Sequence, residues 1–363
     1  MSESKIQVGI IGASGYAGED LARLLIGHPG VQLSLVTSRQ YDGQDFSAIY
    51  PRFTQQPAVQ GLKFSNPAPK DIKKQVDVVF LAVPHGVATE YARPLLDAGI
   101  RVIDLSADFR LKSASVYEEY YGDPHADPDL LQLSVYGLPE RNREAIREAQ
   151  LIACPGCYPT SILIPTLPLL ENRLIQPDSI IANSLSGVSG AGRKVALDFL
   201  FVECNENMRA YGVPKHRHIS EIEQEMNRAL QEEGAARIQF TPHLIPVSRG
   251  IHTTLYWEPN ARFGSASAFK ETEFLNEVDQ AWREAYQGDP LVRLLNTYES
   301  RPLPETKNVL QSQFIDIAWR WDPRTRRLLG FSVIDNLTRG TSGQAVQCMN
   351  LMLGLNETEG LLN

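Results

Sequence analysis

Cys157 has the surroundings of a reactive thiol. It lies in the stretch Ala-Cys-Pro-Gly-Cys-Tyr-Pro-Thr at 153–160. A thiolate there could attack a carbonyl carbon and hold the acyl group as a thioester. Cys154 completes a Cys-x-x-Cys motif, which also suits a redox dithiol. A zinc site needs a second pair of ligands, but Cys204 and Cys348 stand alone, so no metal is predicted. We favour a single catalytic thiol and leave the dithiol and simple packing as alternatives.

The residues after Cys157 predict the start of a helix. Pro159 fits the first position of a helix that continues through 161–170, because the N–H that proline lacks is not needed in the first turn of a helix. Pro165 and Pro168 should kink or end this helix early, so we predict only its first turn. The positive end of the helix would stabilise the thiolate form of Cys157.

An acid–base partner for the thiol is predicted in the segment Lys-His-Arg-His at 215–218, which precedes an acid-rich stretch at 219–232. Histidine titrates near neutral pH, so it could accept the thiol proton or serve the oxygen of a thiohemiacetal. We favour His218 as this group, with His216 as the alternative.

A glycine-rich turn at 12–18 follows an apolar run at 6–12 and opens a helical stretch at 17–26. Its spacing is Gly-x-x-Gly-x-x-Gly, and glycines there let backbone N–H groups approach a pyrophosphate at the start of a helix. A merely tight strand–helix turn is the alternative. The predicted cofactor contacts in the turn are Gly12, Ala13, Ser14, Gly15, Tyr16 and Ala17.

The second apolar run, at 31–37, refines the cofactor. It continues as Ser-Arg-Gln at 38–40, with no acid before Asp42 to bind ribose hydroxyls. Ser38 and Arg39 would suit a 2′-phosphate, which favours NADP(H); a solvated surface arginine is the alternative. Pro84 follows the run at 76–83 and is expected to border the cofactor.

The first part of the chain alternates short apolar runs with helical stretches. This alternation predicts a parallel, doubly wound α/β sheet. The expected strands are 6–12, 31–37, 76–83, 101–105 and 151–153, and the expected helices include 17–26 and 88–98.

After Cys157 the runs are longer and predict a second, α+β domain with a largely antiparallel sheet. The expected strands are 179–185, 238–247, 251–257, 313–321 and 327–334, interrupted by helices at 220–232 and 270–286. In the strand 313–321, Ile315 and Ile317 share one face, and Asp316 and Ala318 take the other, which suggests a half-solvated sheet. A last helix, about 342–353, could lie on either domain.

Composition limits the function further. The chain has 363 residues, 43% hydrophobic and 21% charged, with a net charge of −8. These values suit two soluble domains and give no case for binding nucleic acid or an anionic membrane. No run is long and apolar enough to span a bilayer, and the first five residues precede no apolar signal region. Four cysteines in a chain of this length suggest no disulfide scaffold. We therefore expect a cytoplasmic protein.

Ten segments in this order resemble the N-acetyl-γ-glutamyl-phosphate reductases, arginine-pathway relatives of the aspartate-semialdehyde dehydrogenases. The resemblance covers nearly the whole chain, although Cys154 and Ser220 depart from residues usual in the family. The segments are 12–18, 81–86, 104–110, 136–140, 155–160, 186–193, 215–218, 242–246, 335–337 and 343–347.

The resemblance implies that Cys157 is the nucleophile, that the acid–base histidine comes from 215–218, and that the last helix returns to the nucleotide domain. The implied domains are 1–156 with 336–363 for the dinucleotide and 157–335 for catalysis and oligomerisation. It implies NADPH-dependent reduction of N-acetyl-γ-glutamyl phosphate to N-acetylglutamate 5-semialdehyde, by a homo-oligomer that is a dimer or tetramer.

Further site residues follow from this resemblance. Ser189 and Gly190 resemble the loop that meets the nicotinamide, and Asn336 is expected near the same cofactor. Because the substrate carries a carboxylate and a phosphate, Arg110 and Arg249 are expected to bind it, with ordinary surface charges as the alternative. The other candidate cations are Arg193, Lys194, Lys215 and Arg217. His216 is assigned to the substrate if His218 is the acid–base group.

Two other functions stay open from the sequence. A close relative reduces an amino-adipyl phosphate, one carbon longer, on a carrier protein in lysine synthesis. A nucleotide-sensing protein could keep the fold without the chemistry.

Overall fold

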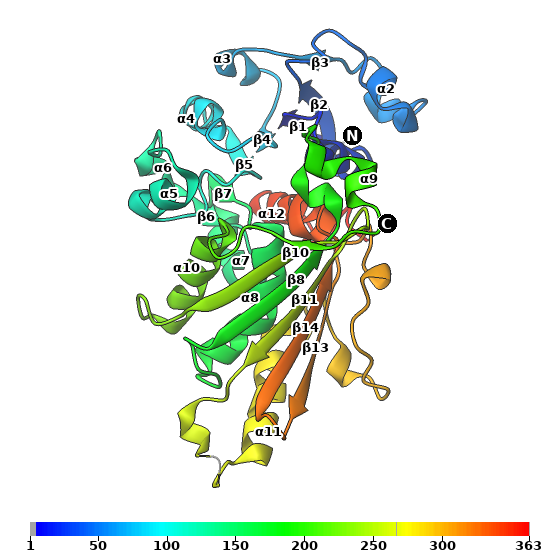
Figure 1. The fold of residues 1–363 in the computed structure, drawn as a ribbon. Coiled ribbons are helices and arrows are strands. Elements are labelled where there is room, and N and C mark those ends of the chain that lie inside the picture. The colour runs from blue at the N-terminus through cyan, green and yellow to red at the C-terminus, as the bar shows by residue number, and fades with distance from the viewer. Residues whose placement is uncertain (1–4, 266, 363) are drawn as a thin grey trace. The chain divides into compact units, whose positions relative to one another are not determined.

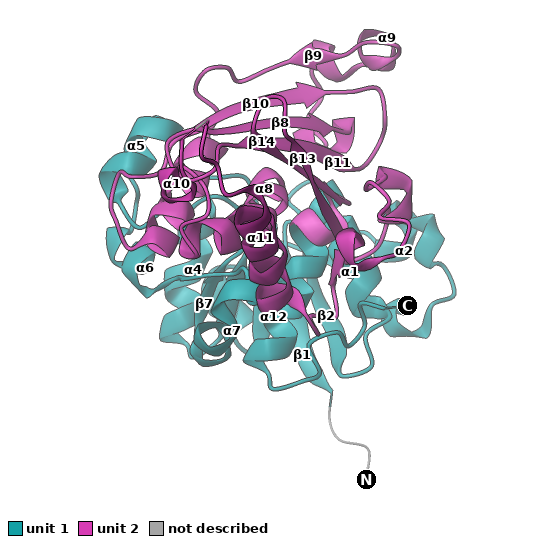
Figure 2. Ribbon diagram, turned by 90° about the horizontal axis from the view of Figure 1, so that it is seen from below, with its two compact units in different colours: residues 1–155, 341–363 teal, residues 156–340 magenta. Residues whose placement is uncertain are grey.

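The computed structural model describes residues 5–265 and 267–362 and divides into two compact units. One unit runs to Pro155 and resumes at Thr341, and the other covers Gly156–Gly340 (Figure 2). The functional domains expected at 1–156 with 336–363 and at 157–335 stay a prediction, and their residues 1–4, 266 and 363 lie outside the described part of the chain. In that part, no helix is long and apolar enough to cross a membrane.

Within these residues, the first unit is built on a seven-stranded sheet in which every pair of neighbouring strands is parallel. Its strand order is β3-β2-β1-β4-β5-β7-β6. The strands are β1 (Ile6–Ile11), β2 (Val31–Thr37), β3 (Phe64–Ser65), β4 (Val78–Leu81), β5 (Arg101–Asp104), β6 (Val135–Tyr136) and β7 (Leu151–Ala153).

Helices cover both faces of this sheet (Figure 1). On β1, Val8 and Ile10 join one hydrophobic core and Ile11 joins the other, because successive side chains of a strand point to opposite faces. The first core includes side chains of α1 (Tyr16–Ile26), α2 (Phe46–Ile49), α7 (Pro139–Glu148) and α12 (Gly343–Met352). The second includes those of α3 (Pro69–Ile72), α4 (Ala88–Asp97) and α6 (Pro128–Leu133). The predicted doubly wound sheet is confirmed.

The second unit also contains seven strands in its described residues, in the order β12-β13-β14-β11-β8-β10-β9. Most neighbours are antiparallel, but β8 with β10 and β12 with β13 are parallel. The strands are β8 (Ile180–Ser186), β9 (Arg209–Ala210), β10 (Ile238–Leu244), β11 (Ile251–Trp257), β12 (Val292–Leu294), β13 (Ile315–Asp322) and β14 (Arg327–Ile334). The largely antiparallel sheet predicted from the sequence is confirmed.

Three helices accompany this sheet: α8 (Cys157–Glu171), α10 (His218–Leu230) and α11 (Glu271–Tyr286). The prediction for α8 was wrong, because Pro159 is its third residue and the helix runs through both later prolines. Pro168 cannot donate to the carbonyl of Ile164. The hydroxyl of Tyr286 donates to that oxygen instead, at 2.5 Å, so a neighbouring helix supplies the missing hydrogen bond.

The solvated face predicted for β13 was also wrong in part. Asp316 and Ala318 are buried, although they face away from Ile315 and Ile317. Asp316 accepts a hydrogen bond at 2.5 Å from the guanidinium of Arg293, on the adjacent strand β12. An ion pair with the edge strand therefore lets a carboxylate lie in a buried position.

Candidate active site

The glycine turn of the first unit joins β1 to α1 with little room for side chains. Gly12 has φ +86°, and a Cβ there would lie 2.5 Å from the carbonyl oxygen of Ala82. A Cβ at Gly18 would lie 2.7 Å from Cα of Ala13. Gly15 precedes the first helical residue and offers no side chain to cap α1. The turn therefore lets a ligand approach the backbone closely at the start of a helix, the arrangement that fits a pyrophosphate.

The end of β2 lies against this turn. The hydroxyl of Thr37 accepts the N–H of Gly12 at 3.1 Å, and the hydroxyl of Ser38 donates to that of Ser14 at 3.1 Å. The side chain of Arg39 is 73% exposed and lies 3.8 Å from the carboxylate of Glu90. Ser38 is thus placed on the turn itself, whereas Arg39 lies at the surface beside it.

The cofactor residues predicted in the first unit gather at one edge of its sheet. They follow the carboxyl ends of β1, β2 and β4, which are neighbours in the strand order. Pro84 is exposed just beyond β4, and Tyr16 is exposed at the start of α1. Ligands of open parallel sheets bind outside the carboxyl ends of the strands, so this edge fits a dinucleotide.

Two buried acids organise the loops at the same edge. Asp108 accepts the backbone N–H of Gly86 at 2.7 Å and that of Ala88 at 3.0 Å, and so fixes the loop between Pro84 and α4. Burial, with the nearby charge of Asp108, raises the pKa of Asp104 to about 7. Sequence reasoning missed Asp108, although it lies within a segment that carried the family resemblance.

Arg110 lies buried beside these acids. It donates Nε to the carbonyl of Cys154 at 2.8 Å and Nη2 to the carbonyl of Leu105 at 3.1 Å. The guanidinium therefore fixes the backbone between β7 and Cys157. Its predicted contact with substrate stays a prediction.

In the second unit, Cys157 is the first residue of α8 and is partly exposed. A Cβ at Gly340 would lie 2.6 Å from Cβ of Cys157, so only glycine fits there without displacement. Gly340 belongs to a π-helical turn, Thr338–Ser342, a feature that often marks functional sites. The thiol thus lies at the N-terminal, positive end of a fifteen-residue helix.

His218 lies against the peptide that precedes the thiol. A Cβ at Gly156 would lie 2.5 Å from Nε2 of His218, so the ring and the backbone of Gly156 are in close contact. Nδ1 of His216 accepts the backbone N–H of His218 at 3.1 Å. Burial and then the charge of Arg217 lower the pKa of His216 to about 4, so its ring is neutral near pH 7. In this arrangement His218 adjoins Gly156, and His216 supports His218.

Glu221 is a residue that sequence reasoning missed. It is buried, and its Oε1 accepts the N–H of Gly156 at 2.8 Å. It follows His218 by three residues on α10, and side chains three apart share one face of a helix. The spacing from His218 was the available signal. Glu221 and His218 therefore both contact Gly156, the residue that precedes Cys157.

An aromatic cluster surrounds these histidines. The hydroxyl groups of Tyr158 and Tyr211 are 2.7 Å apart, and the rings of Tyr158 and Phe240 both contact His216. Burial raises the pKa of Tyr211 to about 12 and that of Tyr158 further still. Both phenols therefore keep their protons near pH 7 and remain hydrogen-bond donors.

The remaining predicted residues of the second unit also come together. Asn336 donates Nδ2 to the hydroxyl of Ser189 at 3.0 Å and accepts the N–H of Gly250 at 2.8 Å. Arg249 lies beside Gly250 and forms an ion pair at 3.5 Å with buried Asp335. Gly190 follows Ser189 in the loop that Asn336 holds, and a Cβ there would lie 3.6 Å from Nδ2 of Asn336.

Comparison with known families matches both units. Residues 7–149 match the model described as semialdehyde dehydrogenase, NAD binding domain, and residues 157–336 match semialdehyde dehydrogenase, dimerisation domain. A protein of Akkermansia muciniphila named N-acetyl-gamma-glutamyl-phosphate reductase is 50% identical over 358 residues, covering 98% of this chain and 99% of that protein. One of the same name from Cellvibrio japonicus is 43% identical, covering 98% of each.

Solved structures share the fold. The aspartate semialdehyde dehydrogenase of Candida albicans with NADP aligns with a TM-score of 0.70 at 16% identity, over 96% of this chain and 98% of that one. The aspartate semialdehyde dehydrogenase II of Vibrio cholerae aligns with a TM-score of 0.68 at 17% identity, over 97% and 99%. At these identities the likeness concerns the fold alone.

Proposed function

Because the chain belongs to the semialdehyde dehydrogenase family, and within it to the N-acetyl-gamma-glutamyl-phosphate reductases, we propose that it converts N-acetyl-γ-glutamyl phosphate and NADPH to N-acetylglutamate 5-semialdehyde, phosphate and NADP⁺. One observation carries the proposal: Cys157 begins α8, and the ring of His218 lies against the peptide just before it. A nucleophile with an adjacent acid–base group is what acyl transfer requires.

The reaction begins at the sulfur. His218 accepts the thiol proton, and the thiolate of Cys157 attacks the acyl carbon. A C–S bond forms, the bond from carbon to the phosphate oxygen breaks, and phosphate leaves with the electron pair. The product is a thioester on Cys157. A thioester accepts hydride far more readily than a carboxylate, so this step makes the reduction feasible.

NADPH, when bound at the glycine turn, supplies the hydride that reduces the thioester. We assign the oxyanion formed at the former carbonyl to the peptide N–H groups of Cys157 and Tyr158, because Pro159 has none and that of Thr160 donates to the carbonyl of Gly156. The N–H of Gly156 is not among them, because it donates to Glu221. The oxyanion then re-forms the carbonyl, the C–S bond breaks with its electron pair left on the sulfur as the thiolate of Cys157, and the semialdehyde leaves.

The substrate is an anion, whereas the whole chain carries a net charge of −8. We assign its phosphate and carboxylate to Arg110, Arg249 and His216. Guanidinium groups bind either anion through two parallel hydrogen bonds. Two observations support this assignment: Asn336 ties Gly250, the neighbour of Arg249, to Ser189, and His216 contacts His218 through its Nδ1.

The cofactor preference is assigned to the end of β2. Replacing Arg39 by alanine should raise the KM for NADPH about tenfold and leave the KM for NADH unchanged, because an exposed charged hydrogen bond to the 2′-phosphate is lost. Lys63→Ala is the matched control: Lys63 is 61% exposed and also forms an ion pair at 3.8 Å, with Asp45. Equal KM values for NADPH in both variants would remove Arg39 from the site.

The match to a dimerisation domain supports a homo-oligomer. We propose a dimer, alone or as half of a tetramer.

The substrate assignment is tested in the reverse direction, with NADP⁺ and phosphate. N-acetylglutamate 5-semialdehyde should give NADPH with a kcat/KM about 10- to 200-fold above that of the semialdehyde one methylene longer. This is about the discrimination that a binding pocket achieves for one methylene group. Omitting phosphate should stop turnover. A preference for the longer semialdehyde or for aspartate semialdehyde would overturn the substrate, and no reaction with any of them would favour a non-catalytic role.

A further inference from the structure

One segment of the second unit exposes an unusual amount of apolar surface. Residues 195–213, here called the apolar arm, include six large apolar side chains between 55% and 90% exposed. They are Val195, Leu197, Phe201, Val202, Met208 and Val213. Apolar surface that gathers in this way marks contact sites more often than isolated exposed residues do.

The apolar arm has an ordered backbone. It contains a short helix, α9 (Phe201–Cys204), and it ends in β9, which pairs with β10. The carbonyl of Asp198 accepts a hydrogen bond from Arg209 at 2.6 Å, so the two ends of the arm are tied together. Figure 2 shows α9 and β9 at the margin of the second unit. These backbone interactions therefore keep the side chains of Phe201 and Val202 exposed to solvent instead of packed against their own chain.

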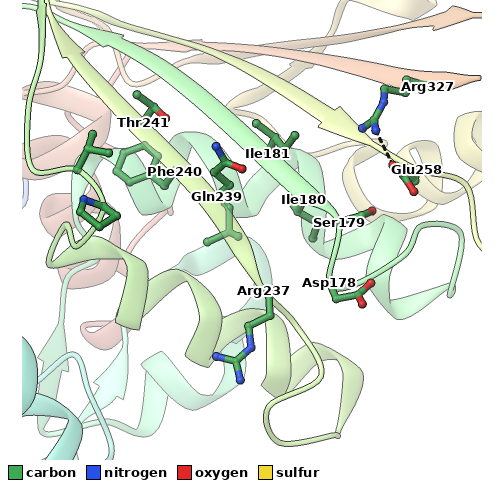
Figure 3. A pocket seen from close by; sticks show the side chains of 13 residues that line it. Asp178, Ser179, Ile180, Ile181, Arg237, Gln239, Phe240, Thr241, Glu258 and Arg327 are labelled. Atoms are coloured by element: carbon green, nitrogen blue, oxygen red, sulfur yellow. Dashed lines mark hydrogen bonds and ion pairs between the residues drawn. The ribbon is translucent and has the colours of Figure 1, made fainter. Parts of the chain in front are cut away.

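The surface beside the end of the arm is hollowed. Val213 and Pro214 line a cavity of about 590 Å³ together with residues of β8 and β10. Figure 3 shows Ile180 and Ile181 on β8 and Gln239 and Phe240 on β10 at this cavity. Residues before His243 on β10 have no partner strand on the side of β9 within the described residues, so the arm ends beside an open sheet edge.

We propose that the apolar arm packs against a second copy of this chain. The arm lies inside the 157–336 match to a dimerisation domain, which favours a second copy over other partners. In a two-fold dimer the same surface of both copies takes part, so each copy offers both the projecting arm and the hollow beside it. The proposal rests on the homo-oligomer of the proposed function and adds the surface that forms it.

The arm is also joined to the residues around the thiol. Tyr211, within the arm, bonds through its hydroxyl to Tyr158, the neighbour of Cys157. A Cβ at Gly212 would lie 2.8 Å from the ring of His216, so the end of the arm touches the histidine that supports His218. Contact with a second copy therefore acts on a segment that touches Tyr158 and His216, and loss of the dimer should lower kcat as well.

The test uses the full-length chain with Phe201→Asp and Val202→Asp combined. Both side chains are exposed, so the subunit should fold, whereas charges at a buried contact should raise the dimer dissociation constant about a hundredfold or more in analytical ultracentrifugation. Leu133→Asp is the control, because Leu133 is 52% exposed but lies in the first unit. An unchanged dissociation constant in the double variant, or a wild type that is monomeric throughout, would overturn the proposal.

A second measurement does not depend on the variant folding. A photo-crosslinking amino acid at position 202 is irradiated in a mixture of ¹⁴N- and ¹⁵N-labelled copies. Crosslinks between differently labelled copies within 157–336 are expected. Crosslinks confined to one copy, or a change in NADPH affinity without a change in assembly, would instead place the arm on its own chain. Dimers that depend on the arm but show no activity on N-acetylglutamate 5-semialdehyde would leave this inference intact and remove the proposed function.

Discussion

Replacing Cys157 by serine should lower kcat at least about 10⁴-fold in both directions, because a serine hydroxyl at this helix start is neutral near pH 7 and no thioester forms. Serine is close to cysteine in size, and Cys157 is partly exposed, so the variant should fold normally. Its NADPH affinity, measured by fluorescence titration, should match that of the wild type.

Cys154→Ser is the matched control for this loss. Cys154 is buried in the core of the first unit, so a hydroxyl there should cost about 1–3 kcal/mol of stability. Its kcat should stay within a few-fold of the wild type after correction for folded protein. If both variants lose activity equally, a dithiol is required. If Cys157→Ser turns over at the wild-type rate, the nucleophile is another group.

Replacing Gly156 by alanine should lower kcat about 10²-fold or more. The backbone of Gly156, with φ −66° and ψ 156°, suits alanine, so no backbone strain is introduced. The added methyl group would lie 2.5 Å from Nε2 of His218, so the ring or the peptide must move. A displacement of about 1 Å between reacting groups costs activity on this scale. Steady-state rates with the rate of Cys157 alkylation by iodoacetamide measure the effect.

Gly27→Ala controls for the general cost of adding a methyl group. Gly27 also has negative φ, and a Cβ there meets nothing nearer than 3.7 Å. It should keep wild-type kcat and alkylation rate. Wild-type rates for Gly156→Ala would show that His218 need not lie against the peptide of Gly156 for catalysis.

Much of the fold is predictable from periodicity, because strands buried on both faces form short apolar runs and half-buried strands alternate apolar and polar residues. The predicted runs at 31–37, 151–153, 251–257 and 327–334 match β2, β7, β11 and β14 residue for residue. The confirmed predictions of the nucleotide-binding sheet and the antiparallel sheet rest on such runs.

Two predictions, the early end of the helix after Cys157 and the solvated face of the strand around Asp316, were wrong because of tertiary contacts. From the sequence, the helix after Cys157 was predicted to end at its prolines. In the structure, Tyr286, on a helix more than a hundred residues further along the chain, supplies a hydrogen bond that one of these prolines cannot make. Local alternation placed Asp316 in solvent, but Arg293 on a neighbouring strand allows it to be buried. No pattern within either segment carries that information.

The candidate site divides in the same way. Residues with distinctive chemistry, such as Cys157 and His218, were found from type and spacing, and their roles stay predictions. Glu221, Gly156 and Gly340 were missed, because they act through close backbone contacts that only the folded chain creates. Glu221 left a signal in its spacing from His218, and Gly156 lies within the segment 155–160 that carried the family resemblance.

In the proposed reaction, an acyl group passes through the sulfur of Cys157. The direct measurement mixes enzyme with N-acetylglutamate 5-semialdehyde and NADP⁺ without phosphate, records NADPH by stopped flow, and maps the modified peptide by mass spectrometry. We expect a burst of one NADPH per Cys157 thiol, with the acyl group on that residue until phosphate is added. A burst with the acyl group on another residue, or turnover with no protein-bound acyl group, would contradict it.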